Sequence, residues 1–157
     1  MLVTAGEGSH DVYANVCHCY VTGLLTHVQT ISTVPAAFAA ESHCAEIKIH
    51  PSGNWVLAPN RGHDSVAVFE ACSHTGRLTM REICPITDTA EGFSPQHIAF
   101  DTSGEHVYCG DGATLIHYYL DTNHGRLVRV RDYPCHGGGS GGQIGGYIAV
   151  DLRGAKL

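Results

Sequence analysis

A turn sequence recurs along the chain at an interval of about 50 residues. His50-Pro51-Ser52-Gly53 lies between two short apolar runs, and Asp101-Thr102-Ser103-Gly104 has the same setting 51 residues later. A second turn, His74-Thr75-Gly76-Arg77-Leu78, is matched by Asn123-His124-Gly125-Arg126-Leu127 at a distance of 49 residues. A fixed interval of this kind is typical of repeat architectures, in which each repeat is one supersecondary unit. The sequence therefore predicts a series of similar structural units.

Each repeat has the pattern of four short strands. Apolar residues alternate with a period near two at Ile47 and Ile49, Val56 and Ala58, Val66 and Val68, and Leu78 and Met80. Glycine-containing turns separate these runs. Repeated four-stranded units of about 50 residues predict an all-β fold, a partial β-propeller of about three four-stranded blades. A β-sandwich also has many short strands, but it does not require its turn sequences to recur.

The repeats divide the 157 residues into one predicted propeller region and a tail. We expect the partial propeller over residues 1–133, with blades at about 1–33, 43–85 and 94–132. Residues 134–157 contain a glycine run and are predicted to be a linker with an additional inner strand at 147–151. Because a closed propeller has typically 4 to 8 blades, we expect either a fragment or self-association through open blade edges.

Composition argues against several classes of partner. The formal net charge is −6 and the nine basic residues are scattered, so nucleic acid is not an expected partner. No apolar run approaches the roughly 18 to 20 residues that span a bilayer, which predicts a soluble, cytoplasmic protein without a membrane partner. The seven cysteines and twelve histidines include no CxxC pair and no HExxH motif, so we expect reduced thiols, no metal and no cofactor.

Four segments together resemble the lactonase family of seven-bladed propellers, which includes 6-phosphogluconolactonase and the carboxymuconate cyclases. They are Thr30–Pro35, Cys44–Gly53, Asn60–Phe69 and Thr75–Thr79. The resemblance runs from about residue 22 to 128 and corresponds to the C-terminal part of such a protein. It implies an active site at one mouth of the central channel and hydrolysis of a small-molecule lactone, such as 6-phosphogluconolactone, or a related lactone cyclisation.

The same resemblance implies Arg61 and Glu7 as catalytic residues. A planar guanidinium can hold a phosphate or carboxylate in two hydrogen bonds, or face an oxyanion that develops on the lactone carbonyl. The alternative is a surface arginine that holds a turn. Glu7 could orient a partner or move a proton during ring opening, or be an ordinary loop carboxylate.

Further residues are candidates for substrate binding on the same grounds, namely Glu46, Asn60, Gln96 and His97. Glu46 belongs to the expected innermost strand of its blade, where it could line the channel or only satisfy a neighbouring turn. Gln96 occupies a position where the family commonly has arginine, and a neutral amide does not replace a cation beside an anionic ligand.

A second function is therefore open, that of a catalytically inactive propeller fragment that acts as an interaction module or needs further blades. The histidine and second arginine that the family uses upstream of the Glu7 position are expected to be absent. Phe69, Tyr118 and Tyr119 are predicted to pack between blades. Arg61 and Glu7 facing one cavity would favour the lactonase, whereas an exposed blade flank would favour the module.

Overall fold

The computed structural model describes residues 2–7, 12–19, 25–86, 95–110 and 114–134, whose regular structure is all β-strand. The first sheet contains β1 (Leu2–Glu7), β2 (Val12–Cys19) and β3 (Leu25–Ser32). The middle sheet contains β4 (His43–Cys44), β5 (Lys48–Ile49), β6 (Trp55–Arg61), β7 (Ser65–Ala71) and β8 (Leu78–Pro85). The third sheet contains β9 (His97–Phe100), β10 (His106–Gly110), β11 (Thr114–Asp121) and β12 (Arg126–Pro134).

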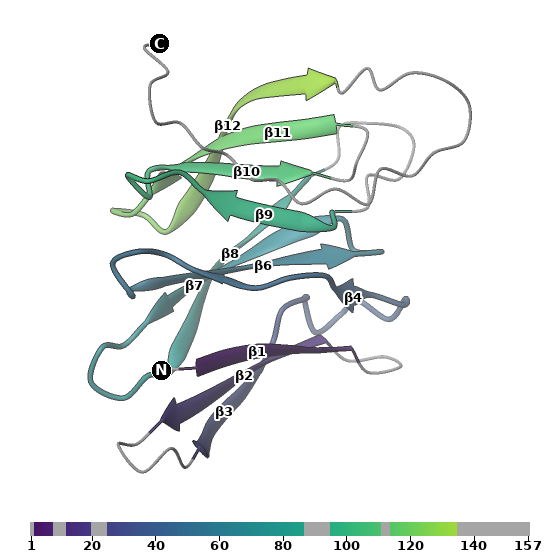
Figure 1. Cartoon of the computed structure of the whole chain (residues 1–157). Coiled ribbons are helices and arrows are strands. Elements are labelled where there is room, and N and C mark those ends of the chain that lie inside the picture. Colours follow the sequence, from purple (N-terminus) through teal and green to yellow (C-terminus); the bar gives the residue numbers. More distant parts are fainter. Residues whose placement is uncertain (1, 8–11, 20–24, 87–94, 111–113, 135–157) are drawn as a thin grey trace.

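The three sheets follow one another in space as they do in the chain, from purple to green in Figure 1. Strands that are neighbours in sequence pair antiparallel within each sheet, and the short strands β4 and β5 both pair with β6 as two segments of one inner strand. This is the arrangement of consecutive propeller blades, which confirms the predicted all-β partial propeller. The first sheet has three strands in its described residues.

The middle sheet is covered on one face by the third sheet and on the other by the first, and side chains alternate between these faces along β6. Trp55 and Leu57 join a cluster with buried residues of the third sheet. Val56 and Ala58 join a second cluster, against which partly buried residues of the first sheet pack. Every one of these four residues is at most 8% exposed. Two apolar cores therefore hold three sheets together.

The predicted packing role is confirmed for two of the three aromatic residues. Phe69 and Tyr118 are 0% and 1% exposed and belong to the two cores. Tyr119 is 40% exposed, so its prediction was wrong. Since successive side chains of a strand point to opposite faces, Tyr118 points toward the middle sheet and Tyr119 to the uncovered face of the third sheet.

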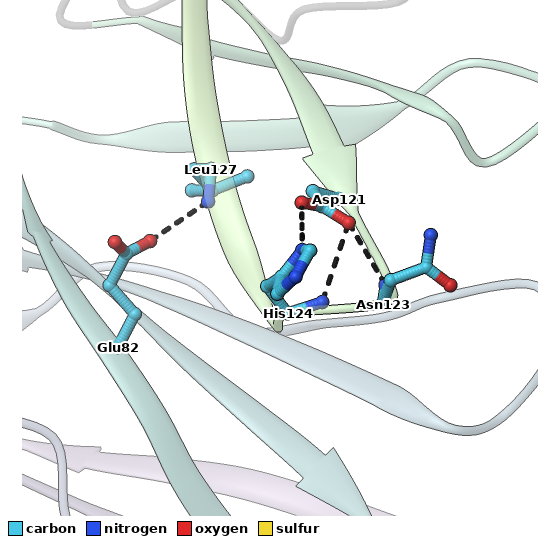
Figure 2. Close-up of polar contacts among 5 residues, drawn as sticks. All are labelled: Glu82, Asp121, Asn123, His124 and Leu127. Atoms are coloured by element: carbon cyan, nitrogen blue, oxygen red, sulfur yellow. Dashed lines mark hydrogen bonds and ion pairs between the residues drawn. The ribbon is translucent and has the colours of Figure 1, made fainter.

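Side chains of one sheet accept hydrogen bonds from the backbone of the next. The Gln29 side-chain oxygen accepts the N–H of Leu78 at 2.8 Å, while its amide nitrogen donates to the Leu78 carbonyl at 3.0 Å. One sheet further, a carboxylate oxygen of Glu82 accepts the N–H of Leu127 at 2.8 Å, as Figure 2 shows. Leu78 and Leu127 are equivalent residues of the recurring turn, so the same contact is repeated at both sheet interfaces.

The turn before β12 is held by its own carboxylate. Asp121 accepts hydrogen bonds from the N–H groups of Asn123 and His124 and from the His124 ring nitrogen, all visible in Figure 2. The His124 side chain lowers the pKa of Asp121, because it hydrogen-bonds to the ionised form. Gly125 follows with φ +67°, and a β-carbon there would lie 2.9 Å from the Trp55 ring. This close contact makes the turn part of the sheet interface.

The described residues include no helix long and apolar enough to cross a membrane.

Replacing Glu82 by alanine is expected to lower the free energy of unfolding by about 1–3 kcal/mol, because the buried Leu127 N–H loses its acceptor. Glu82→Gln retains an acceptor oxygen and should lose less. Glu105→Ala, at an exposed side chain, is the matched control. Urea denaturation measures all three, and equal losses for Glu82→Ala and Glu82→Gln would contradict a role for this hydrogen bond.

Candidate functional site

The predicted site residues gather at one end of the sheets. Glu7 is the last residue of β1 and pairs with Val12 of β2. Arg61 is the last residue of β6, and the preceding Asn60 pairs with Ser65 of β7. We call this end the Arg61 end. It lies on the right in Figure 1. Glu7 and Arg61 therefore occupy equivalent ends of neighbouring sheets.

The turn that follows Arg61 requires glycine. Gly62 has φ +89°, and a β-carbon there would overlap the carbonyl oxygen of Glu41. The N–H of Gly62 donates to the Asp64 side chain at 3.2 Å, and Asp64 itself has φ +50°. The backbone of the segment before β4 thus approaches the turn closely, which is allowed because Gly62 has no side chain.

A fully buried polar network lies beneath this turn. The Asn60 amide nitrogen donates to the Thr33 carbonyl at 2.9 Å and to the Ser65 hydroxyl at 3.2 Å. The Thr33 hydroxyl donates to the Asn60 side-chain oxygen at 2.7 Å. All three residues are 0% exposed. The Asn60 amide is therefore occupied by protein groups, and the structure places this predicted substrate-binding residue under the site.

Arg61 itself is half-buried at the end of β6. It pairs with His43 of β4, and its carbonyl accepts the Ser42 hydroxyl at 3.0 Å. The backbone of Arg61 is thereby held on the side of β4 and, through Asn60, on the side of β7. This places the guanidinium on a rigid strand end rather than on a free loop.

His63 is a residue of this turn that the sequence did not single out. Its Nδ1 lies 2.7 Å from the Ser65 hydroxyl, and its ring packs edge-on against Phe38 with centroids 4.6 Å apart. Burial lowers the pKa of His63, against the opposing effect of Asp64. Its only sequence signal was its position within the Asn-Arg-Gly-His-Asp turn.

Three other predicted residues come together on the inner strands of two neighbouring sheets. A carboxylate oxygen of Glu46 accepts the N–H of Ile98 at 2.9 Å, and the same oxygen lies 3.9 Å from His97 Nδ1. The other oxygen pairs with Lys48 Nζ at 2.6 Å. Gln96, next to His97, donates its backbone N–H to the Gly110 carbonyl at 2.9 Å. Glu46 thus connects two blades, and both it and His97 remain 28% exposed.

Glu7 is placed only by its backbone, as the last residue of β1. Strand β1 lies against β4, which carries the residue paired with Arg61. That Glu7 and Arg61 face one cavity remains a prediction. The turn at 111–113 and the tail from 135, including the strand predicted at 147–151, lie outside the described residues.

Within the described ranges, no group of three or more His, Cys, Asp or Glu side chains is arranged to hold a metal ion. The described cysteines whose state is known, Cys44, Cys72, Cys84 and Cys109, are free thiols. Burial raises the pKa of Cys84 to about 11, so this thiol is protonated at neutral pH.

Comparisons with known proteins relate this chain to one protein family. A family model described as lactonase, 7-bladed β-propeller, matches residues 4–141. The 6-phosphogluconolactonase of Bacillus subtilis is 31% identical over 108 residues, which are 68% of this chain and 30% of the relative. The 6-phosphogluconolactonase of Pectobacterium carotovorum is 27% identical over 129 residues, 81% of this chain and 36% of the relative. The chain thus spans about a third of the length of these relatives.

Solved structures show the same fold. A protein from Lactobacillus plantarum superimposes with a TM-score of 0.69 at 24% identity, over 83% of this chain and 37% of that protein. The periplasmic gluconolactonase of Pseudomonas aeruginosa superimposes with a TM-score of 0.68 at 23% identity, over 82% of this chain and 35% of that protein.

Replacing Asn60 by alanine is expected to lower the free energy of unfolding by about 2–3 kcal/mol, because Thr33 and Ser65 lose their buried partner. Asn123→Ala, at an exposed turn, is the control and should change it by less than about 0.5 kcal/mol. Urea denaturation measures both variants. Equal stabilities would contradict the positioning role of Asn60.

Proposed function

Because the chain belongs to the lactonase family of seven-bladed β-propellers, we propose that its Arg61 end takes part in the hydrolysis of a sugar lactone such as 6-phosphogluconolactone. The relatives named 6-phosphogluconolactonase support this substrate class. The proposed reaction proceeds in the cytoplasm without a bound cofactor. Since the chain spans about a third of its relatives, this proposal concerns the chain's share of such a site.

The observation that carries the proposal is the rigid placement of Arg61. Its strand end is held by the Ser42 hydroxyl, by the pairing with His43 and by the buried Asn60 network. From a strand end whose backbone is fixed, the Arg61 guanidinium can donate two parallel hydrogen bonds to a phosphate or carboxylate, or stabilise an oxyanion, so that only the side chain itself has to be ordered.

In the proposed mechanism, water adds to the lactone carbonyl carbon and Arg61 stabilises the oxyanion that forms. The bond from the carbonyl carbon to the ring oxygen then breaks, and the ring oxygen takes the proton that the attacking water gives up. Glu7, at the equivalent end of the neighbouring sheet, is proposed to move that proton. Glu46, Gln96 and His97 are proposed to bind substrate hydroxyl groups from the inner strands, while Asn60 acts as a positioning residue.

The test is a hydrolysis assay with 6-phosphogluconolactone, corrected for spontaneous ring opening. Arg61→Ala is expected to lower kcat/KM by about 100- to 1,000-fold, the loss typical of a removed oxyanion donor. Arg61→Lys keeps the charge but not the planar fork, so its kcat/KM should lie between those of the wild type and Arg61→Ala. Arg126→Ala, an exposed arginine of β12, is the matched control. Equal rates for Arg61→Ala and Arg126→Ala would overturn the assignment.

The uncovered face of the third sheet favours a second function, that of an interaction module. Among the described residues, the large exposed apolar side chains are Ile49 and four residues of β11 and β12, namely Tyr119, Val128, Val130 and Tyr133. In the middle sheet the corresponding face is covered by the third sheet. Because the corresponding face of the middle sheet is covered by a neighbouring sheet, we propose that a second copy of this chain covers the exposed face of the third sheet.

Light scattering on the full chain tests this pairing. The expected mass is that of two or more chains of 16.7 kDa each. Val128→Glu should shift the mass toward that of a single chain, because a buried carboxylate without a partner is unfavourable. Thr102→Glu, at an exposed turn of the same sheet, is the control and should keep the wild-type mass. A single-chain mass for the wild type would exclude the second copy as partner.

A further inference from the structure

A cavity of about 770 Å³ lies at the opposite end of β6 from Arg61. Trp55 and Arg61 are the first and last residues of that strand, so about 20 Å of extended backbone separates the cavity from the proposed lactonase site. The middle sheet supplies most of the walls, and Thr122 of the third sheet supplies one side. The volume falls within the range of small-molecule sites.

The walls carry hydrogen-bonding groups but little net charge. The Glu70 carboxylate is paired with the Arg81 guanidinium, whose Nε donates to it at 2.8 Å. Both ring nitrogens of His50 are engaged, Nδ1 with the Ser52 hydroxyl at 2.7 Å and Nε2 with the Gly104 carbonyl at 3.1 Å. No lysine or arginine belongs to the described lining. Because Arg81 beside this lining is already paired with Glu70, an anionic ligand would find no uncompensated cation on the described walls.

The groups open to a ligand are neutral. Asn54, Ser73, Thr79 and Thr122 line the cavity and are exposed, so their amide and hydroxyl groups can donate and accept hydrogen bonds. Trp55 adds an apolar edge that is 8% exposed, and its packing in the core holds it in place. Small-molecule sites combine such an aromatic surface with a few fixed polar groups.

We propose that this cavity binds a neutral, hydroxyl-rich molecule, namely an uncharged sugar. Sugar hydroxyls both donate and accept, which matches amide and hydroxyl walls, whereas a sugar phosphate or sugar acid would be left without a counter-charge. The site differs from the Arg61 end in the charge of the ligand it takes. It therefore does not depend on the proposed lactonase activity.

The exposed thiol of Cys72 belongs to the same walls and reports on occupancy. The Thr75 side chain hydrogen-bonds to Cys72 and lowers its pKa, which increases the reactive thiolate fraction at a given pH. A ligand in the cavity should shield this thiol. Peptide mass spectrometry follows Cys72 separately from the other cysteines.

The experiment adds D-glucose, cellobiose or 6-phosphogluconate to the full chain at millimolar concentration. It records iodoacetamide labelling of Cys72 and saturation-transfer NMR of each sugar. At least one neutral sugar should slow the labelling and give a transfer signal, and 6-phosphogluconate should not slow it. Labelling of Cys72 that no neutral sugar slows, or that 6-phosphogluconate slows equally, would overturn the proposal.

Two variant pairs locate the binding. Asn54→Ala is expected to weaken neutral-sugar binding by roughly 3- to 10-fold, the effect of one lost hydrogen bond, with Asn123→Ala unchanged. Thr122→Trp should narrow the cavity and weaken binding more strongly than Asn54→Ala, with Thr102→Trp unchanged. Both cavity positions are exposed, so neither variant disturbs the core. Neutral-sugar binding that is lost in Arg61→Ala but kept in Thr122→Trp would place the ligand elsewhere.

Discussion

The contact on which the arrangement of the sheets depends is a side-chain acceptor of one blade bound to a backbone N–H of the next. Gln29 binds Leu78, and Glu82 binds Leu127, at equivalent positions of successive outer strands. Glu46 binds the N–H of Ile98 between inner strands. Apolar packing alone would allow one sheet to slide over another, whereas these directional bonds fix the relative position of neighbouring sheets.

Fixed sheets allow the two ends of the strands to differ in chemistry. At the Arg61 end, the buried amide of Asn60 and the glycine turn hold a permanently charged side chain at a strand end. At the other end, Glu70 is paired with Arg81, and the lining adds hydroxyl and amide groups beside the Trp55 ring and the Cys72 thiol. One strand, β6, thus connects the end that carries Arg61 with the cavity at its other end, and its buried middle keeps them apart.

The strands could be predicted from the sequence because their information is local. Alternating apolar residues and recurring turns predicted the sheets. Phe69 lies on the opposite face from Val66 and Val68 and is buried because both faces of the middle sheet are covered. The partners across sheets could not be predicted, since Gln29 and Leu78 are 49 residues apart and nothing in either segment identifies the other. The resemblance implied that Asn60 contacts substrate, and its buried role could not be predicted because its partner Thr33 is 27 residues away.

The third sheet departs from the repeat at the positions that connect blades. Counted by the repeat interval, His97 replaces Glu46 and Arg131 replaces Glu82. The register agrees, because Arg131 pairs with His117 as Glu82 pairs with Val68. At the Glu82 position a carboxylate acceptor has therefore become a guanidinium, which only donates hydrogen bonds, and at the Glu46 position an imidazole. The third sheet covers the middle sheet by donating backbone N–H groups to Glu82 and Glu46. It does not itself have carboxylates at the equivalent positions to accept such N–H groups from a further blade. A second copy on the third sheet would have to offer carbonyl or carboxylate oxygens instead, which a chain with a net charge of −6 has in excess.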